Sequence, residues 1–176
     1  MCMPPLDDPR VLLISGSGSD EPMVQQYQGK LESLGVHSDW RVASAHRTPE
    51  HAAKLFDYFD KAPDYLAGGA IADFQNALAA AWAANTSKPV YALRPQIKGP
   101  IEDATQQLAE VLGVLYLPPG VSAPLVVGVE NGALALAKVV AGHVPEVATN
   151  VRKYLDEKAS KVMKKDAELW KAQEEG

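Results

Sequence analysis

The chain has 176 residues, of which 47% are hydrophobic and 22% charged, and its formal net charge is -5. These values predict one mildly acidic globular domain with a sizeable core, and they argue against a general affinity for nucleic acid or anionic membranes. The single cysteine, Cys2, excludes a disulfide framework and the N-terminal MCMPPLDDPR lacks a signal-peptide pattern, so we expect a cytoplasmic protein without a membrane span.

The first predicted elements are a buried strand, a helix and a second strand. The run at 11–15 is short, apolar and closed by glycine and serine, which is typical of a buried strand. Asp20 is expected to cap a helix that ends at Gly35. The apolar residues on one face of this helix are Met23, Tyr27, Leu31 and Leu34. Residues 37–44 predict the second strand.

Pro49 suits the first turn of a second helix, whose apolar positions include Ala52, Leu55, Phe56 and Phe59. Residues 65–72 predict a third strand, whose glycines indicate that another group approaches it closely. The remaining expected elements are helices over 76–86, 101–112 and about 130–141, and strands over 89–93 and 114–118.

Strands that alternate with helices predict a parallel sheet covered on both faces. The expected fold class is therefore α/β, a three-layer α/β/α sandwich of the flavodoxin-like type. Residues 1–10 are expected to form a tail, residues 11–142 the main domain, and residues 143–176 a long C-terminal helix that begins near Pro145.

An apolar stripe runs along the otherwise charged C-terminal helix. Its members are Val147, Val151, Tyr154, Leu155, Val162 and Leu169. Such a stripe either docks on a neighbouring subunit or packs back on its own domain, and the pattern favours neither alternative.

Polar segments follow the first three predicted strands: SGSGSD at 15–20, SAHRTP at 44–49 and ADFQNA at 72–77. Ligands of open parallel sheets bind beyond the carboxyl ends of the strands, where these segments should meet. The first segment suits a phosphate at a helix N-terminus, although a plain capped turn explains it as well. It lacks the Gly-Lys-Ser/Thr of a Walker loop and the third glycine of a dinucleotide fingerprint.

In the second segment, Arg47 has a planar fork that can hold a phosphate, and His46 can carry a proton near neutral pH. Asp73 and Asn76 in the third segment either help to bind a ligand or cap the following helix. The other histidines are interpreted as surface or packing residues: His37, His51 and His143.

The segments GSGSD and SAHR resemble the phosphoribosylaminoimidazole carboxylase family of purine biosynthesis. The family pattern is Gly-Ser-x-Ser-Asp, followed at a similar interval by Ser-Ala-His-Arg or Ser-Ala-His-Lys, and residues 117–138 are similar to its later Met/Leu-Pro-x-Gly segment and helix. The resemblance covers about residues 11–142 and implies carboxylation of 5-aminoimidazole ribonucleotide at C4, or the reverse decarboxylation. It also implies a homo-octamer that uses carbon dioxide or bicarbonate as co-substrate and needs neither a metal nor another cofactor.

The resemblance implies a role for each matched residue. His46 would be the general acid and base at C4. Ser17, Ser44 and Arg47 would hold the 5′-phosphate of the ribonucleotide, and Asp20 would accept hydrogen bonds from its ribose hydroxyls. The implied substrate site is completed by Ser19 and Asn76.

The segment after the third predicted strand departs from both branches of the family. The mutase branch, which rearranges an N5-carboxylated substrate, has a histidine here, whereas this chain has none between His51 and His143. The carbon-dioxide-using branch has Ala-Gly-Arg-Ser-Asn-(Ala/Gly)-Leu, and here Asp73, Phe74 and Gln75 replace Gly-Arg-Ser.

An atypical carboxylase of the carbon-dioxide-using branch is the leading interpretation, since that branch has a similar trailing helix. The alternatives are a mutase, a ribonucleotide-binding protein with little catalysis and, more remotely, a flavodoxin-like electron carrier.

Overall fold

A computed structural model describes residues 6, 8–72, 77–95, 112–113 and 115–174 of the chain. Five parallel strands form one sheet in the order β2-β1-β3-β4-β5. The strands are β1 (Arg10–Ser15), β2 (His37–Val42), β3 (Tyr65–Ile71), β4 (Val90–Arg94) and β5 (Leu125–Val127). The helices are a 3-10 turn η1 (Gly18–Asp20), α1 (Glu21–Ser33), α2 (Pro49–Lys61), α3 (Ala77–Ala83), α5 (Val129–Ala141) and α6 (Pro145–Glu174).

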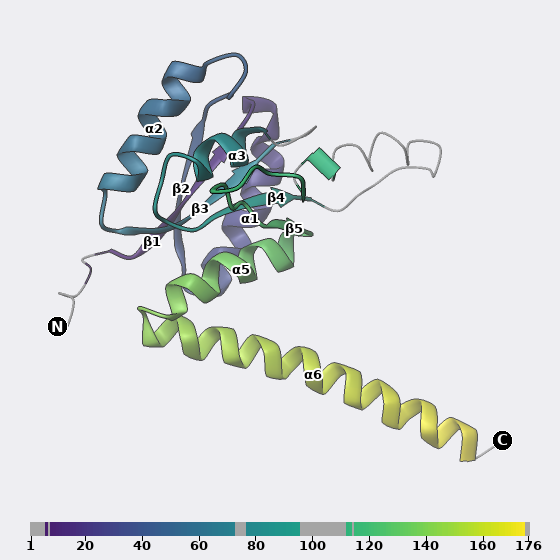
Figure 1. Cartoon of the computed structure of the whole chain (residues 1–176). Helices are drawn as coiled ribbons and strands as arrows, with labels where there is room; N and C mark the ends of the chain where they lie inside the picture. The colour runs from purple at the N-terminus through teal and green to yellow at the C-terminus, as the bar shows by residue number, and fades with distance from the viewer. Residues whose placement is uncertain (1–5, 7, 73–76, 96–111, 114, 175–176) are drawn as a thin grey trace.

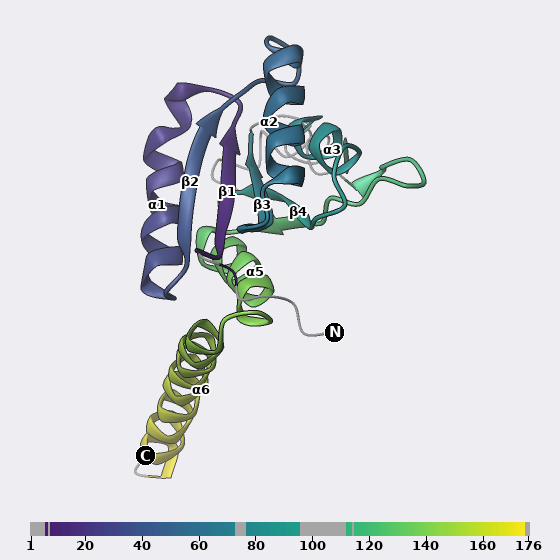
Figure 2. The same cartoon turned by 90° about the vertical axis from the view of Figure 1, so that its left-hand side faces the viewer.

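Helices cover both faces of the sheet, as Figures 1 and 2 show. Helices α2 and α3 pack on one face, α1 and α5 pack on the other, and α6 begins beside α5. The fold is therefore the expected three-layer, flavodoxin-like α/β/α sandwich with a long C-terminal helix.

The interior strand β1 is apolar because helices cover it on both sides. Val11 and Leu13 belong to the core formed with α1, α5 and the start of α6. Leu12 and Ile14 belong to the core formed with α2 and α3. A strand buried on both faces needs a continuous apolar run rather than an alternating one, and this is why its position could be predicted.

The glycines of β3 make room for the protein's own core. A Cβ atom on Gly68 would lie 2.6 Å from the ring of Trp82, and one on Gly69 would lie 2.6 Å from the Leu93 side chain. The close approach that these glycines predicted is therefore made by side chains of α3 and β4.

The predicted strand over 114–118 is wrong. Leu115 is helical, residues 116–118 have no regular structure, and the exposed fractions of Leu115 and Tyr116 are 61% and 86%. The fifth strand is instead β5, which pairs with β4 from Ala92 to Arg94. An apolar run becomes a strand only where a partner strand offers its backbone groups, and among the described residues the run at 115–118 has no such partner. Most of the helix predicted over 101–112, residues 101–111, lies outside the described residues.

The first half of α6 packs on its own domain, whereas the second half is exposed. Val147 and Val151 belong to the core, and Asn150 Nδ2 donates a 3.3 Å hydrogen bond to the Leu34 carbonyl oxygen. From Asp156 to Glu174 every side chain is exposed, and this part of the helix extends away from the sheet (Figure 1). Packing back on the domain is thus confirmed for the first half. No described helix, including α6, is both long enough and apolar enough to cross a membrane.

Candidate active site

The polar segments after β1 and β2 meet at the carboxyl end of the sheet. Strand β1 lies between β2 and β3, so the sheet has its topological switch point there. The Ala43 N–H donates to the Ser15 carbonyl oxygen over 2.9 Å, and Arg47 Nη2 donates to the Gly16 carbonyl oxygen over 2.7 Å. Two segments that lie far apart in the sequence are therefore joined into one structure.

The first segment, residues 16–20, is closed by a capping box. Ser17 Oγ accepts a hydrogen bond of 3.3 Å from the Ser19 N–H, while Asp20 Oδ2 accepts one of 2.9 Å from the Ser17 N–H. The Ser19 hydroxyl donates to Ser17 Oγ over 2.8 Å. Asp20 stands at the N-cap position of α1, as predicted, but its carboxylate caps no N–H of that helix.

The second segment, residues 44–48, is a turn held by two hydroxyl groups. The Ser44 N–H donates to Thr48 Oγ1 over 2.9 Å, and that hydroxyl donates back to the Ser44 carbonyl oxygen over 3.2 Å. Ser44 Oγ accepts from the Arg47 N–H over 3.1 Å. Within the described structure the hydroxyls of Ser17 and Ser44 only accept hydrogen bonds, so each keeps its own O–H for a ligand.

Both segments line one cleft with a volume of about 320 Å³. The structure brings Ser17, Ser44 and Arg47 together there, as predicted. The lining residues are Gly16, Ser17, Gly18, Val42, Ala43, Ser44, Arg47, Thr48 and His51. Sequence reasoning missed Thr48 and His51. Pro49 could have indicated them, because it is the first residue of α2. Thr48 and His51 therefore lie at the N-terminus of this helix, which faces the carboxyl end of the sheet.

The remaining predicted site residues occupy different places. His46 is exposed on the turn between Ser44 and Arg47 and is not among the residues that line the cleft. Ser19 and Asp20 are tied to Ser17 by hydrogen bonds. Asn76 lies outside the described residues, as do residues 73–75.

The cleft suits a small anion. Arg47 is its permanent cation, and no carboxylate is among its described lining residues. A guanidinium has five N–H groups, so the bond to Gly16 leaves Arg47 with donors for an oxyanion. In the described part of the chain, no three His, Cys, Asp or Glu side chains come together as a metal site.

The chain is similar in sequence and fold to known proteins of one family. A sequence profile of the family described as AIR carboxylase matches residues 10–161. A phosphoribosylaminoimidazole carboxylase of Archaeoglobus fulgidus is 32% identical over 160 residues, which are 91% of this chain and 84% of that protein. An N5-carboxyaminoimidazole ribonucleotide mutase of Pyrococcus abyssi is 30% identical over 158 residues, which are 85% of this chain and 83% of that protein. The crystal structure of Treponema denticola PurE superposes with a TM-score of 0.82 at 26% identity, covering 92% of this chain and 98% of that one.

Proposed function

Because the chain belongs to the AIR carboxylase family, we propose that it carboxylates 5-aminoimidazole ribonucleotide at C4 with carbon dioxide, or catalyses the reverse decarboxylation. It is an enzyme of purine biosynthesis whose relatives are named carboxylases and mutases. The observation that carries the proposal is the cleft in which Ser17, Ser44 and Arg47 converge.

The cleft is proposed to hold the 5′-phosphate of the ribonucleotide. The O–H groups of Ser17 and Ser44 and the remaining N–H groups of Arg47 are donors, and a phosphate has only acceptor oxygens to offer them. The positive charge of Arg47 strengthens its hydrogen bonds to a dianion. In this proposal Ser19, Asp20 and Asn76 complete the substrate site.

The chemistry needs one group that exchanges a proton with C4. C4 of the aminoimidazole ring is an enamine-like carbon, whose electron pair forms the new bond to the carbon of carbon dioxide. The C4–H bond then breaks, its electrons restore the aromatic ring, and the proton passes to a base. The proposed base is His46, which precedes Arg47 on the same turn, and such assistance is worth about 10²–10⁴-fold. In decarboxylation the protonated imidazole returns this proton to C4 as carbon dioxide leaves. Because the ring itself supplies the electrons, the proposal includes no metal or organic cofactor.

A mutase is the second candidate, because several relatives carry that name, including the protein of Pyrococcus abyssi at 30% identity. The two activities differ in their substrates: the carboxylase uses 5-aminoimidazole ribonucleotide and carbon dioxide, whereas the mutase uses the N5-carboxylated ribonucleotide.

The test follows the ultraviolet absorbance of the C4-carboxylated product in wild-type protein, His46→Asn and the control His143→Asn. His143 is also exposed but lies between α5 and α6, away from the cleft. Wild type and His143→Asn are expected to interconvert the two ribonucleotides in a bicarbonate-dependent manner, whereas His46→Asn should lose nearly all turnover. Conversion of the N5-carboxylated substrate alone would assign the mutase activity instead.

Exchange of the C4 proton with deuterated water isolates the role of His46. This exchange, followed by NMR without carbon dioxide, requires only the base and the bound ring. Wild type is expected to exchange the proton and His46→Asn is not. Equal exchange in both proteins would remove His46 as the base and would favour a binding protein with little catalysis.

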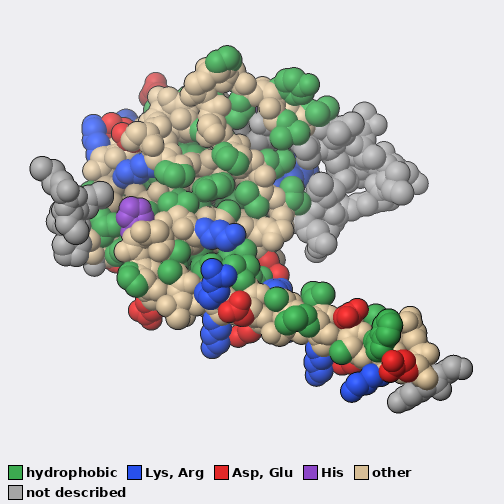
Figure 3. Space-filling model, turned by 60° about the horizontal axis from the view of Figure 1, so that its bottom comes forward, with side chains coloured by type: hydrophobic (Ala, Val, Ile, Leu, Met, Phe, Trp, Pro, Cys, Tyr) green, Lys and Arg blue, Asp and Glu red, His purple; other side chains and the backbone are tan. Residues whose placement is uncertain are grey.

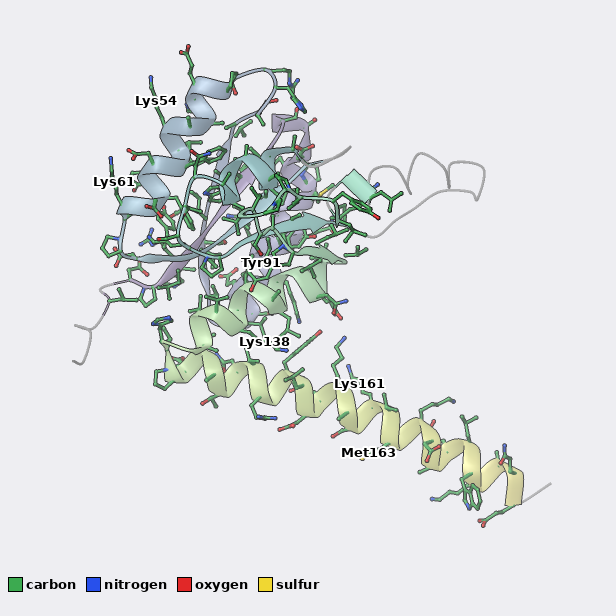
Figure 4. All side chains as sticks on the ribbon, in the orientation of Figure 1. Lys54, Lys61, Tyr91, Lys138, Lys161 and Met163 are labelled. Atoms are coloured by element: carbon green, nitrogen blue, oxygen red, sulfur yellow. The ribbon has the colours of Figure 1, made fainter. Side chains whose placement is uncertain are left out.

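We also propose that the chain assembles with copies of itself into the octamer that the family resemblance implies. The second half of α6 supports this proposal. Val162, Met163 and Trp170 are exposed by 70%, 64% and 64%. Lys161 and Met163 point to opposite sides of α6 (Figure 4), and both side chains are exposed, so the domain of the same chain covers neither side of this half of the helix.

A further inference from the structure

Ser15 is an unusual residue for its position. It ends β1 after four apolar residues and is completely buried. Among the described Ser, Thr, Asn, Gln and charged residues it is the only buried one. A hydroxyl in such a place is costly unless it is hydrogen-bonded, so its partners show what it does there.

The Ser15 hydroxyl is the middle member of a chain of two hydrogen bonds. Trp40 Nε1 on β2 donates to Ser15 Oγ over 2.9 Å, and Ser15 Oγ donates to the Ser17 carbonyl oxygen over 2.8 Å. The direction is fixed, because an indole N–H only donates and a carbonyl oxygen only accepts. Donation by Trp40 polarises the Ser15 hydroxyl and strengthens its bond to Ser17.

Ser15 also holds the second segment of the site through its backbone. Its carbonyl oxygen accepts the 2.9 Å hydrogen bond from the Ala43 N–H, one residue before Ser44. Its side chain therefore fixes the first phosphate-binding segment and its backbone fixes the second. Neither Ser15 nor Trp40 is among the residues that line the cleft.

We propose that Ser15 and Trp40 are positioning residues of this enzyme, which hold the Ser17 turn in the shape that binds the substrate phosphate. The proposal rests on the proposed phosphate site. Without the bond from Ser15, the Ser17 carbonyl loses its buried anchor, and the Ser17 hydroxyl no longer points reliably at the cleft. Because His46 lies on the other segment, loss of the anchor is expected to weaken binding while leaving the proton transfer intact.

The test compares Ser15→Ala and Trp40→Phe with the control Tyr65→Phe. Tyr65→Phe removes a hydrogen bond of 2.6 Å to Asp39 at the start of β3, the end of that strand opposite the cleft. Calorimetry with ribose 5-phosphate measures binding without turnover. The dissociation constant should rise about three- to tenfold in Ser15→Ala, rise less in Trp40→Phe and stay unchanged in Tyr65→Phe.

The double variant tests whether the two residues act as one chain. In Ser15→Ala the Trp40 N–H has lost its acceptor, the Ser15 hydroxyl, and can no longer act on the Ser17 turn. Adding Trp40→Phe should therefore weaken binding no further than Ser15→Ala alone. In steady-state kinetics the KM for the ribonucleotide should rise with kcat nearly unchanged, which is the signature of lost ground-state binding. Inorganic phosphate should also change the tryptophan fluorescence of wild type but not that of Trp40→Phe.

Equal affinities of Ser15→Ala and wild type for ribose 5-phosphate would overturn the proposal, as would an equal loss in Tyr65→Phe. Absence of ribose 5-phosphate binding in wild type would overturn it together with the phosphate site. A wild type that binds ribose 5-phosphate in a Ser15-dependent way but turns over no ribonucleotide would reject the proposed function alone.

Discussion

In the proposed phosphate site, we expect the guanidinium of Arg47 to combine two functions that a simple positive charge would not combine. Its Nη2 donates to the Gly16 carbonyl oxygen over 2.7 Å and so fixes the plane of the fork. Its other N–H groups are then held in a set direction for an oxyanion. A lysine at this position would retain the charge but lose this geometry.

Replacing Arg47 by alanine is expected to weaken ribonucleotide binding by about 1.5–3 kcal/mol, the scale of a charge-assisted hydrogen bond. Arg47→Lys should lie between wild type and Arg47→Ala, because it keeps only the charge. Titration calorimetry measures the affinities, and thermal denaturation should show little loss of stability, since the Arg47 side chain is exposed. An unchanged affinity in Arg47→Ala would refute the phosphate site.

Tyr27 carries a polar group that the core does not use. The residue is completely buried on α1, and its hydroxyl has no hydrogen-bond partner in the described structure. Burial raises the pKa of Tyr27 far above its usual range. Tyr27→Phe removes the unsatisfied oxygen and keeps the ring, so we expect the free energy of unfolding to rise by about 1–2 kcal/mol. A lower melting temperature than that of wild type would count against this assignment.

At the scale of the elements, one carboxylate joins the starts of three strands. Asp39 Oδ2 on β2 accepts hydrogen bonds from Arg10 Nη1 on β1 over 2.9 Å and from the Tyr65 hydroxyl on β3 over 2.6 Å. Burial raises the pKa of Asp39, but the hydrogen bonds from Tyr65 and Arg10 outweigh it and leave the pKa below its ordinary value.

A carboxyl group with a lowered pKa in the folded state stabilises the fold above its unfolded pKa. This stabilisation is lost as the pH falls through the folded value. The melting temperature of Asp39→Asn should therefore lie below that of wild type at neutral pH. The difference should shrink as the pH falls below about 4, the ordinary pKa of an aspartate. Thermal denaturation between neutral and acidic pH measures this difference, and one that stays constant would show that the charge of Asp39 does not contribute.

The sequence predicted the elements that have a clear apolar pattern and missed β5, which depends on a distant partner strand. Strand β1 was predictable because its apolar run is continuous, and helix α2 was predictable because its apolar residues follow the helical period. Strand β5 has three residues, and only its pairing with β4 identifies it. In the site, the polar segments after β1 and β2 were expected to meet, and Ser17 and Arg47 do line one cleft. His51 was missed because a sequence shows that a polar residue is exposed, but not whether it lines a cleft.

At the scale of the whole molecule, two apolar surfaces among the described residues bear on assembly. One is the exposed second half of α6, a helix of 30 residues, and the other is a groove of about 470 Å³ on α5. The groove is lined by Tyr91, Asn131, Leu134, Ala135, Lys138 and Val139. Hydrophobic side chains gather over α5 and reappear along α6 between charged ones (Figure 3). A second copy of the chain could cover both surfaces by reciprocal contacts, as symmetric oligomers do.

Removal of residues 161–176 is expected to lower the mass of the assembly measured by light scattering. The cut follows Ser160, because a cut at Pro145 would also remove Val147 and Val151 from the core. The ion pair of 2.7 Å between Lys158 and Glu130 is retained, so the domain should keep its melting temperature. A full-length monomer at micromolar concentration, or an unchanged mass after truncation, would exclude α6 as the contact.

The glycine at position 68 also constrains which residues can stand opposite it in the core. Because a Cβ atom there would meet the ring of Trp82 at 2.6 Å, the neighbouring helix is sufficient to require a glycine at this position. The identity of residue 68 therefore depends on the size of residue 82, so a larger residue at position 68 would require a smaller one than tryptophan at position 82. The packing of the core is sufficient to explain why this position of β3 is a glycine.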